Sequence, residues 1–251
     1  MIVRILKTTT FSLLFLLIIN CSLFQKRKQV IIITNYGNIT LELYNETPKH
    51  RDNFIKLIKD SVYTNLLFHR TIKSFMIQGG DPDSKTAKPG QFLGEGGLPY
   101  TIPAEFDKKL YHKRGVLAAA REGDSTNPKK ESSSTQFYIV VGKKFTEKDL
   151  VTLENKRNQP LLKKKLEKLK ASTKEDTLKA KKLLEKTMFK IPKKHRSTYI
   201  KDGGTPHLDQ NYTVFGEVID GMEVVDKIVN LQTDKNDRPI EDIRFTIKMK
   251  N

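Results

Sequence analysis

Residues 68–81 read FHRTIKSFMIQGGD. Apolar and polar side chains alternate in two short runs on either side of a polar turn, which predicts two paired β-strands. Pairing through that turn places Arg70 and Gln78 on one face, at the rim of an apolar patch that contains Phe75 and Met76. These residues alone leave two interpretations open, a binding rim that carries an arginine or an ordinary hairpin whose apolar side chains belong to the core.

Short β-rich runs separated by glycine and turn residues continue on both sides of this stretch. The predicted strands cover residues 30–34, 39–44, 66–71, 75–79, 115–119, 136–141, 213–218 and 243–249. Apolar residues at helical spacing predict two helices, one over 48–59 that Thr47 caps and a proline begins, and one over 222–229. Many short strands with only two helices favour a mainly β protein built as a closed antiparallel barrel.

The composition excludes several classes of protein. The chain has 251 residues, with 46 Lys and Arg against 29 Asp and Glu, a net charge of +17 and 37% hydrophobic residues. That apolar share is too high for a wholly disordered chain, and no apolar run approaches the roughly 20 residues of a membrane-spanning helix, which excludes a polytopic membrane protein. A single cysteine excludes a disulfide framework within one chain and a cysteine-rich zinc site.

The N-terminus predicts a secretory signal. Arg4 and Lys7 form a basic region, and residues 11–19, FSLLFLLII, form an apolar run too short to span a bilayer. We expect residues 1–20 to be a signal peptide and the protein to be exported.

The lone cysteine lies directly after this signal. Cys21 resembles the lipid-accepting cysteine of bacterial lipoproteins, although Asn20 departs from the small residue that usually precedes it. We expect a lipid on Cys21, a tether over residues 21–29, and a membrane-anchored protein in the periplasm or at the outer membrane. An ordinary cleaved signal and an uncleaved anchor are the alternatives.

Most of the positive charge belongs to one segment. Residues 144–195 contain 17 Lys and Arg against 7 Asp and Glu, and apolar residues at helical spacing over 161–190 predict helices there. We expect residues 143–202 to form a basic helical insertion into a barrel made of residues 30–142 and 203–251. Three roles are open for it: a solvated helical hairpin, contact with anionic lipid or cell-wall polymers, and nucleic-acid binding, which is not expected because exported proteins seldom meet nucleic acid.

Four ordered motifs resemble one family. FHRTIKSFMIQGGD (68–81), GVLAAAR (115–121), TQFYI (135–139) and VFGEV (214–218) are similar to the motifs of the cyclophilin family of peptidyl-prolyl cis-trans isomerases. The resemblance covers about 170 residues, everything except the leader and the insertion. It implies a closed eight-stranded antiparallel barrel capped by two helices and an isomerase of X-Pro bonds that uses no metal or cofactor.

The resemblance assigns catalysis to two residues. Arg70 matches the family's catalytic arginine, and Gln78 matches the glutamine that hydrogen-bonds the substrate backbone. Rotation about a peptide bond meets a barrier of roughly 18–20 kcal/mol because the amide is conjugated. In the twisted transition state the proline nitrogen regains a lone pair, so a fixed donor stabilises that state more than the planar one.

The resemblance also supplies a substrate-binding set. Ala120 and Arg121 match the backbone that contacts the residue before the proline, where many members have Asn instead of the arginine. The full set is Phe75, Met76, Ala120, Arg121, Gln136, Tyr138, Leu208 and Tyr212.

Several positions depart from the family pattern or need an assignment. Tyr138 replaces a phenylalanine and adds a hydroxyl that needs a partner or solvent. His207 and Tyr212 stand where the best-known eukaryotic members carry Trp and His, and the absent Trp predicts weak cyclosporin binding. We expect His69 to be structural, because the alternation that aims Arg70 at the groove points its neighbour away.

The sequence therefore predicts a peptidyl-prolyl cis-trans isomerase that acts on unfolded, proline-containing exported polypeptides and assists their folding. The alternative is a non-catalytic peptide-binding or chaperone module that uses the same groove. Arg70 together with Gln78 favours the enzyme, because a binding module has no need of a donor aimed at the proline nitrogen.

Overall fold

The computed structural model describes residues 26–168, 173–185 and 187–250. The predicted signal peptide, Cys21 and most of the predicted tether lie outside these residues. Within the described part of the chain, no helix combines the length and the apolar character needed to cross a bilayer.

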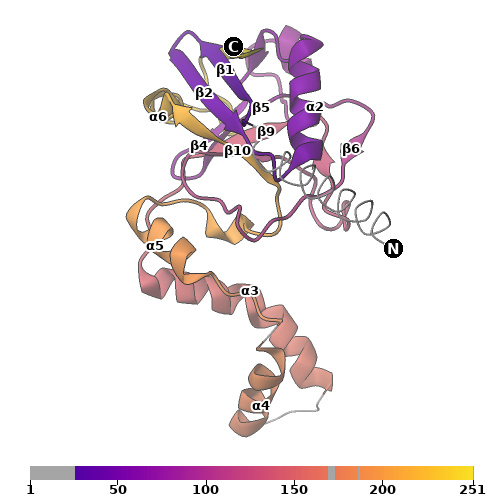
Figure 1. Cartoon of the computed structure of the whole chain (residues 1–251), viewed down its shortest axis with the longest axis vertical. Coiled ribbons are helices and arrows are strands. Elements are labelled where there is room, and N and C mark those ends of the chain that lie inside the picture. The colour runs from indigo at the N-terminus through magenta and orange to yellow at the C-terminus, as the bar shows by residue number, and fades with distance from the viewer. Residues whose placement is uncertain (1–25, 169–172, 186, 251) are drawn as a thin grey trace, which may run out of the picture.

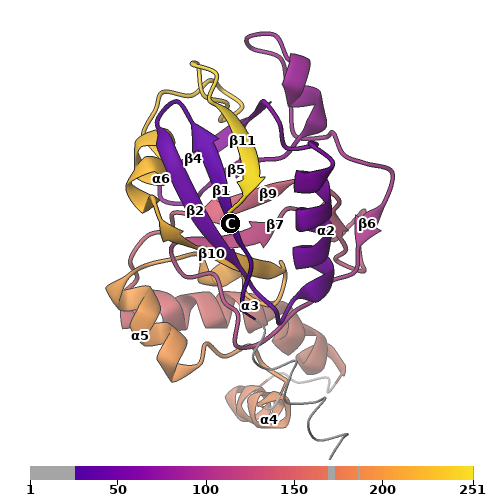
Figure 2. The same ribbon diagram turned by 45° about the horizontal axis from the view of Figure 1, so that its top comes forward.

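One curled antiparallel sheet forms the body of the molecule (Figures 1 and 2). Its nine strands, in spatial order, are β3 (Leu66–Leu67), β11 (Arg244–Met249), β1 (Gln29–Thr34), β2 (Gly37–Leu43), β10 (Val214–Asp220), β7 (Val116–Ala119), β9 (Phe137–Val140), β5 (Met76–Gly79) and β4 (Arg70–Ile72). A separate ribbon pairs β6 (Thr101–Ile102) with β8 (Ser132–Ser133).

The strand count differs from the expected eight because residues 66–71 form two strands. Phe68 and His69 separate β3, which pairs with β11, from β4, which pairs with β5. The chain thus passes directly from one edge of the sheet to the other. Among the described residues no ladder joins β3 to β4, so the expected closed barrel is a curled sheet whose two edges are joined by the chain itself.

Two helices complete the main core. α2 (Pro48–Lys59) and α6 (Met222–Val229) lie on opposite sides of the curled sheet (Figure 1). Their apolar faces join the inward side chains of the strands in one buried cluster, represented by Phe54, Ile77, Phe137 and Val225. Burial of this apolar surface is the main stabilising contribution to the fold.

The expected cap of α2 is wrong in one respect. Thr47 occupies the N-cap position, but its hydroxyl makes no capping hydrogen bond. Instead the Glu105 carboxylate, from a distant loop, accepts hydrogen bonds from the backbone N–H of Lys49 at 3.1 Å and of His50 at 3.0 Å. Burial alone would raise the pKa of Glu105, but hydrogen bonds from His50 and Lys49 lower that pKa below its usual value.

The insertion between β9 and β10 is helical, and its first helix begins earlier than predicted. Its helices are α3 (Glu147–Lys168), α4 (Lys174–Leu184) and α5 (Lys193–Lys201), followed by the short η2 (Pro206–Leu208). Thr146 and Asp149 start α3, because each side chain accepts a hydrogen bond from the other's backbone N–H, at 3.2 and 2.8 Å. Apolar residues before position 161 do not recur at a clear helical spacing, so periodicity alone does not predict this start of α3.

The insertion has a small core of its own that touches the barrel. Leu150, Ile191 and Tyr199 are buried together, and Tyr111 of the barrel packs against them. The Tyr111 ring stacks on His195 with ring centroids 3.6 Å apart. The mainly β fold with two capping helices and a basic helical insertion is confirmed.

Candidate active site

The pleat of four neighbouring strands places the predicted site on the outer face of the sheet. Arg70 lies opposite Gln78, Gln78 opposite Tyr138, and Tyr138 opposite Ala118 in the strand register. Their neighbours Thr71, Ile77, Phe137 and Leu117 are buried. The residues of this row therefore share one face, since side chains alternate along a strand.

A cavity of about 160 Å³ opens on that face. It is lined by Arg70, Phe75, Met76, Gln78, Ala120, Arg121, Tyr138, Leu208 and Tyr212. Met76, Tyr138 and Leu208 form its buried apolar floor as part of a second cluster, separate from the main core. An apolar cavity of about 150 Å³ holds one benzene molecule, so this cavity suits one small ring.

Nine of the ten residues predicted for catalysis and substrate binding line this cavity, and Gln136 lies beside it. The Gln136 side chain instead orients the Gln78 amide. The Gln136 amide nitrogen donates to the carbonyls of Gly94 at 2.8 Å and Gly96 at 2.7 Å, and its oxygen accepts from the Gln78 amide at 3.0 Å. Because these bonds fix both amides, the Gln78 oxygen faces Arg70 at 3.5 Å from Nη1.

Arg70 stands at the rim of the cavity with its side chain 42% exposed. Its Nε lies 3.5 Å from a carboxylate oxygen of Asp237, and the carbonyl of Asp237 accepts a hydrogen bond from the backbone N–H of Thr71 at 2.8 Å. Neither the Asp237 nor the Gln78 contact uses Nη2. Asp237 was missed by the sequence argument, which has no signal to pair this loop residue with a distant strand.

The Tyr138 hydroxyl has a buried partner that the sequence did not identify. Nε2 of His112 lies 3.0 Å from this hydroxyl, and Nδ1 of His112 lies 3.0 Å from Asp209, which also accepts from the Tyr199 hydroxyl at 2.7 Å. A carboxylate only accepts hydrogen bonds, so Nδ1 of His112 carries a proton and donates to Asp209, while Nε2 is paired with the Tyr138 hydroxyl. Burial raises the pKa of Tyr138 well above its usual range. The network links the cavity floor to α5.

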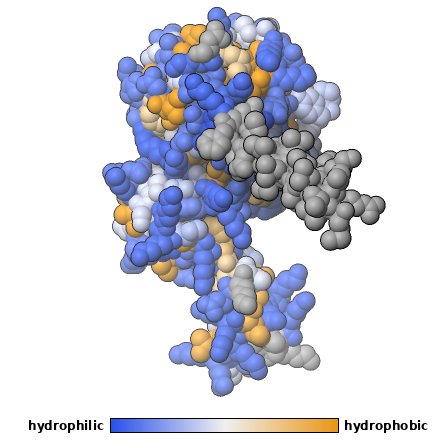
Figure 3. All heavy atoms as spheres, in the orientation of Figure 1, coloured by the Kyte–Doolittle hydropathy of each residue, from blue (hydrophilic) through white to orange (hydrophobic). Residues whose placement is uncertain are grey.

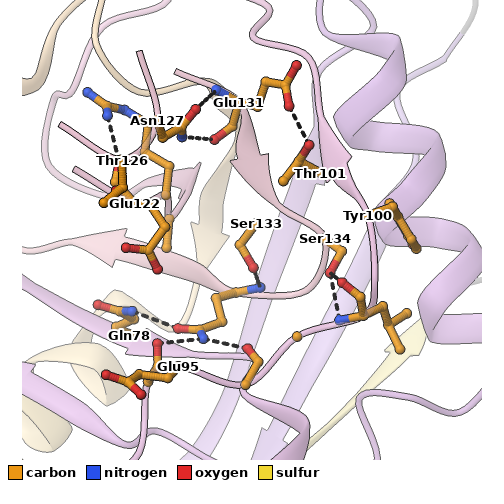
Figure 4. A pocket seen from close by; sticks show the side chains of 17 residues that line it. Gln78, Glu95, Tyr100, Thr101, Glu122, Thr126, Asn127, Glu131, Ser133 and Ser134 are labelled. Carbon is orange, nitrogen blue, oxygen red and sulfur yellow. Dashed lines mark hydrogen bonds between the residues drawn. The ribbon is translucent and has the colours of Figure 1, made fainter. Parts of the chain in front are cut away.

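A second cavity, of about 410 Å³, adjoins the first along Gln78, Ala120 and Arg121 (Figure 4). Three acidic residues stand around it, Glu95, Glu122 and Glu131. Gln78 lies at its lower edge in that view, and its amide donates the hydrogen bond to Gln136 described above. The site thus offers a ring-sized cavity with an apolar floor next to a larger and more polar one.

A family model described as cyclophilin type peptidyl-prolyl cis-trans isomerase/CLD matches residues 29–248. This chain belongs to the cyclophilin-type peptidyl-prolyl cis-trans isomerases. It is a peptidyl-prolyl cis-trans isomerase of the cyclophilin type.

The curated relatives of this cyclophilin include bacterial proteins. A Staphylococcus aureus protein named as a peptidyl-prolyl cis-trans isomerase is 30% identical over 217 residues, which cover 86% of this chain and 87% of that protein. A Streptococcus pyogenes serotype M6 protein named as a bifunctional phosphatase/peptidyl-prolyl cis-trans isomerase is 34% identical over 219 residues. The alignment covers 86% of this chain and 37% of that longer protein.

Solved structures give the same family. A cyclophilin type peptidyl-prolyl cis-trans isomerase of Cryptosporidium parvum is similar with a TM-score of 0.58 and 25% identity, covering 90% of this chain and 98% of that one. Its structure in the presence of the dipeptide Ala-Pro gives a TM-score of 0.57 at 25% identity, covering 89% and 99%.

The Arg121 guanidinium of this cyclophilin is bound by neighbouring groups of the same chain. Its guanidinium donates to the carbonyls of Asn211 and Glu122, both at 2.7 Å, and pairs with Asp124 at 2.7 Å. The same group lies over the Tyr212 ring, 4.5 Å from its centroid. Its side chain therefore acts as a wall that holds Tyr212 in place.

His69 and His207, the two histidines discussed from the sequence, do not line the cavity. His69 is buried at 3% exposure on the other side of the strand from Arg70, and burial lowers its pKa to about 4. The His207 ring packs against Phe75, with ring centroids 5.7 Å apart. It covers the far side of that cavity wall.

Proposed function

We propose that Arg70 is the catalytic donor and Gln78 the substrate-orienting residue of this isomerase. The observation that carries the proposal is the position of the Arg70 guanidinium, at the rim of a ring-sized apolar cavity and in register with Gln78. A proline ring that fills the cavity brings its imide bond to this rim. Nη2 of Arg70 then faces the nitrogen whose lone pair appears on rotation.

The required rate gain sets what these residues have to supply. X-Pro isomerisation takes tens to hundreds of seconds unassisted. A step on the millisecond scale is about 10⁵-fold faster, or roughly 7 kcal/mol lower in barrier. A charged guanidinium held by Asp237 and Gln78 contributes part of this by donating to the proline nitrogen, and Gln78 contributes by holding the neighbouring backbone.

Replacing the arginine tests this assignment. We expect Arg70→Ala to lower kcat/KM in a proline-peptide isomerisation assay by about 10²–10³-fold, because the loss of one transition-state donor costs about that much. Binding of the same peptide should change far less, since the apolar cavity remains. Arg244→Ala, which removes an arginine of similar exposure on β11 outside the site, is the matched control.

Two outcomes would separate the competing assignments. An Arg70→Ala rate within twofold of wild type would contradict the catalytic role of the arginine. A wild-type protein that binds the peptide without accelerating its isomerisation would favour the peptide-binding or chaperone module instead.

We propose further that the enzyme acts on exported polypeptides and is anchored to a membrane through Cys21. The proposal is supported by the basic region at Arg4 and Lys7, the apolar run over 11–19 and the lone cysteine after them. We expect wild type to sediment with membranes of a bacterial host and Cys21→Ser to be soluble. Equal distribution of the two proteins would contradict lipid anchoring at this cysteine.

For the basic insertion we propose contact with an anionic surface, and the Cys21→Ser protein allows this contact to be measured separately from the lipid anchor. Lys163, Lys164 and Lys165 project from α3 and carry part of the charge that supports this contact. With the soluble Cys21→Ser protein, binding to phosphatidylglycerol vesicles should fall with salt and when these three lysines become glutamines. Salt-insensitive or unchanged binding would exclude the contact.

A further inference from the structure

The insertion adds a groove beside the proline cavity. A cavity of about 630 Å³ lies between α3 and the segment around η2, which contact each other. We call it the α3 groove, lined by Lys143, Phe145, Asp149, Thr152, Leu153, Lys156, Arg157, Pro160, His207 and Asn211. Apolar side chains, among them Phe145 and Leu153, line it together with polar and charged ones, and hydrophilic residues cover most of the visible face of the insertion (Figure 3).

The α3 groove and the proline cavity share a wall. Phe75 lines the proline cavity and His207 lines the groove, and their rings pack with centroids 5.7 Å apart. Asn211 of the groove directly precedes Tyr212 of the cavity in the chain. Since an extended chain advances about 3.3–3.6 Å per residue, a polypeptide that leaves the cavity over this wall enters the groove within a few residues.

The charge of the groove is mostly positive. Lys143, Lys156 and Arg157 contribute three cations against the single carboxylate of Asp149. This is the reverse of the second cavity, which adjoins the proline cavity along Gln78 and where Glu95 and two further glutamates stand (Figure 4). The two cavities next to the proline cavity therefore differ in charge, the second cavity being acidic and the α3 groove basic.

Arg157 is the residue that points to a ligand. Its Nη1 is buried and has no hydrogen-bond partner, and no carboxylate of the described residues lies within ion-pair distance of its guanidinium. The Phe189 ring holds the group in place, 3.7 Å from its centroid, and burial lowers the pKa of Arg157. By contrast, Arg196 of the same insertion pairs with Glu147 and Glu154, both at 2.6 Å. A half-buried guanidinium that is fixed but unpaired favours an incoming carboxylate.

We propose that the α3 groove binds the part of the substrate polypeptide that follows the proline, and that Arg157 and Lys156 bind an aspartate or glutamate side chain within four residues of it. The side follows from Ala120 and Arg121, which match the positions for the residue before the proline and line the second cavity, not the α3 groove. The inference rests on the isomerase activity and names a substrate class for it. It makes the insertion a specificity element.

A peptide series tests the proposal. Peptides that carry Glu, Gln or Lys at each of the four positions after one X-Pro bond are compared at low salt by kcat/KM and, separately, by Kd from calorimetry. We expect Glu to exceed Gln by about tenfold at one of these positions, and Lys to be weakest, because a charge-assisted hydrogen bond contributes about that factor.

Variants of α3 assign the preference to the groove. Arg157→Gln should reduce the Glu-to-Gln ratio to near one, whereas Arg157→Lys, which keeps a cation there, should retain part of it. Lys148→Gln, on the same helix but exposed and outside the groove, removes the same charge and should keep the full ratio. Circular dichroism of each variant checks that the helices persist.

The outcomes are distinct from a failure of the isomerase activity. Turnover of every peptide at the same rate, with equal Kd for Glu and Gln at all four positions, would overturn the proposal while leaving the activity intact. Equal loss of the ratio in Arg157→Gln and Lys148→Gln would also overturn it, by showing a long-range charge effect. If no peptide is turned over, the ratio of the Kd values of the Gln and Glu peptides still tests whether the groove prefers an acidic residue.

Discussion

At the scale of single residues, the alternation of side chains along each strand separates the residues of the active site from those of the main core. On β5, Met76 and Gln78 face the cavity while Ile77 between them is buried in the main core. A slip of one residue in the register would bury Gln78 and expose Ile77, because side chains alternate along a strand. The position of Arg70 opposite Gln78 depends on the same register.

His69 gives a residue-scale prediction about pH. Burial lowers its pKa to about 4 in the folded protein, against 6.5 for an exposed histidine. As pH falls below 6.5, the unfolded chain binds this proton first, so the free energy of unfolding falls through the window from about 6.5 to 4. The full effect is about 3 kcal/mol at the acid end of the window.

Urea unfolding at pH 7, 6, 5 and 4.5 measures this effect. His69→Leu should show a flatter dependence on pH than wild type, since it cannot take up the proton. The idea would be wrong if wild type and variant lost stability in parallel across the window.

At the scale of elements, the roots of the insertion decide how it joins the barrel. Gly142 enters it with φ +65° and Gly204 leaves it with φ +149°. A Cβ added to Gly142 would collide with the backbone of Gly204, and one added to Gly204 would meet the Tyr199 ring at 2.7 Å and the His112 carbonyl. Only glycine permits the two chain segments to approach this closely.

Gly142→Ala therefore should lower the free energy of unfolding by more than about 2 kcal/mol, from backbone strain together with a collision that a backbone cannot relieve. Gly90→Ala is the matched control, because Gly90 has φ +74° but no atom within 4 Å of an added Cβ, so only the strain of about 1 kcal/mol applies. Urea denaturation of both variants measures the difference. Equal losses would show that the close approach at the insertion roots contributes nothing.

At the scale of the whole molecule, the insertion is coupled to the active site at two places. The buried network runs from Tyr138 at the cavity floor through His112 and Asp209 to Tyr199 of α5. The α3 groove lies against the cavity wall on the other side of Phe75. A segment that adds most of the net charge thus also shapes the surroundings of the bound proline.

The sequence by itself determined the elements that follow local rules. Periodicity predicted the strands of the nine-stranded sheet and both capping helices but not the short pair β6 and β8. The motifs with their resemblance assigned ten site residues, nine of which, including Arg70 and Gln78, meet around one cavity. It erred where a local rule was overridden. The run over 66–71 divides in two, and Thr47 does not cap α2 because Glu105 takes that role.

Only the tertiary structure decided which distant residues meet. Asp237 beside Arg70, His112 beneath Tyr138 and the unpaired Arg157 in the α3 groove have no local signature. The physical reason is that periodicity reports which side of one element is apolar, whereas these contacts depend on how the curled sheet and the insertion bring separate segments together.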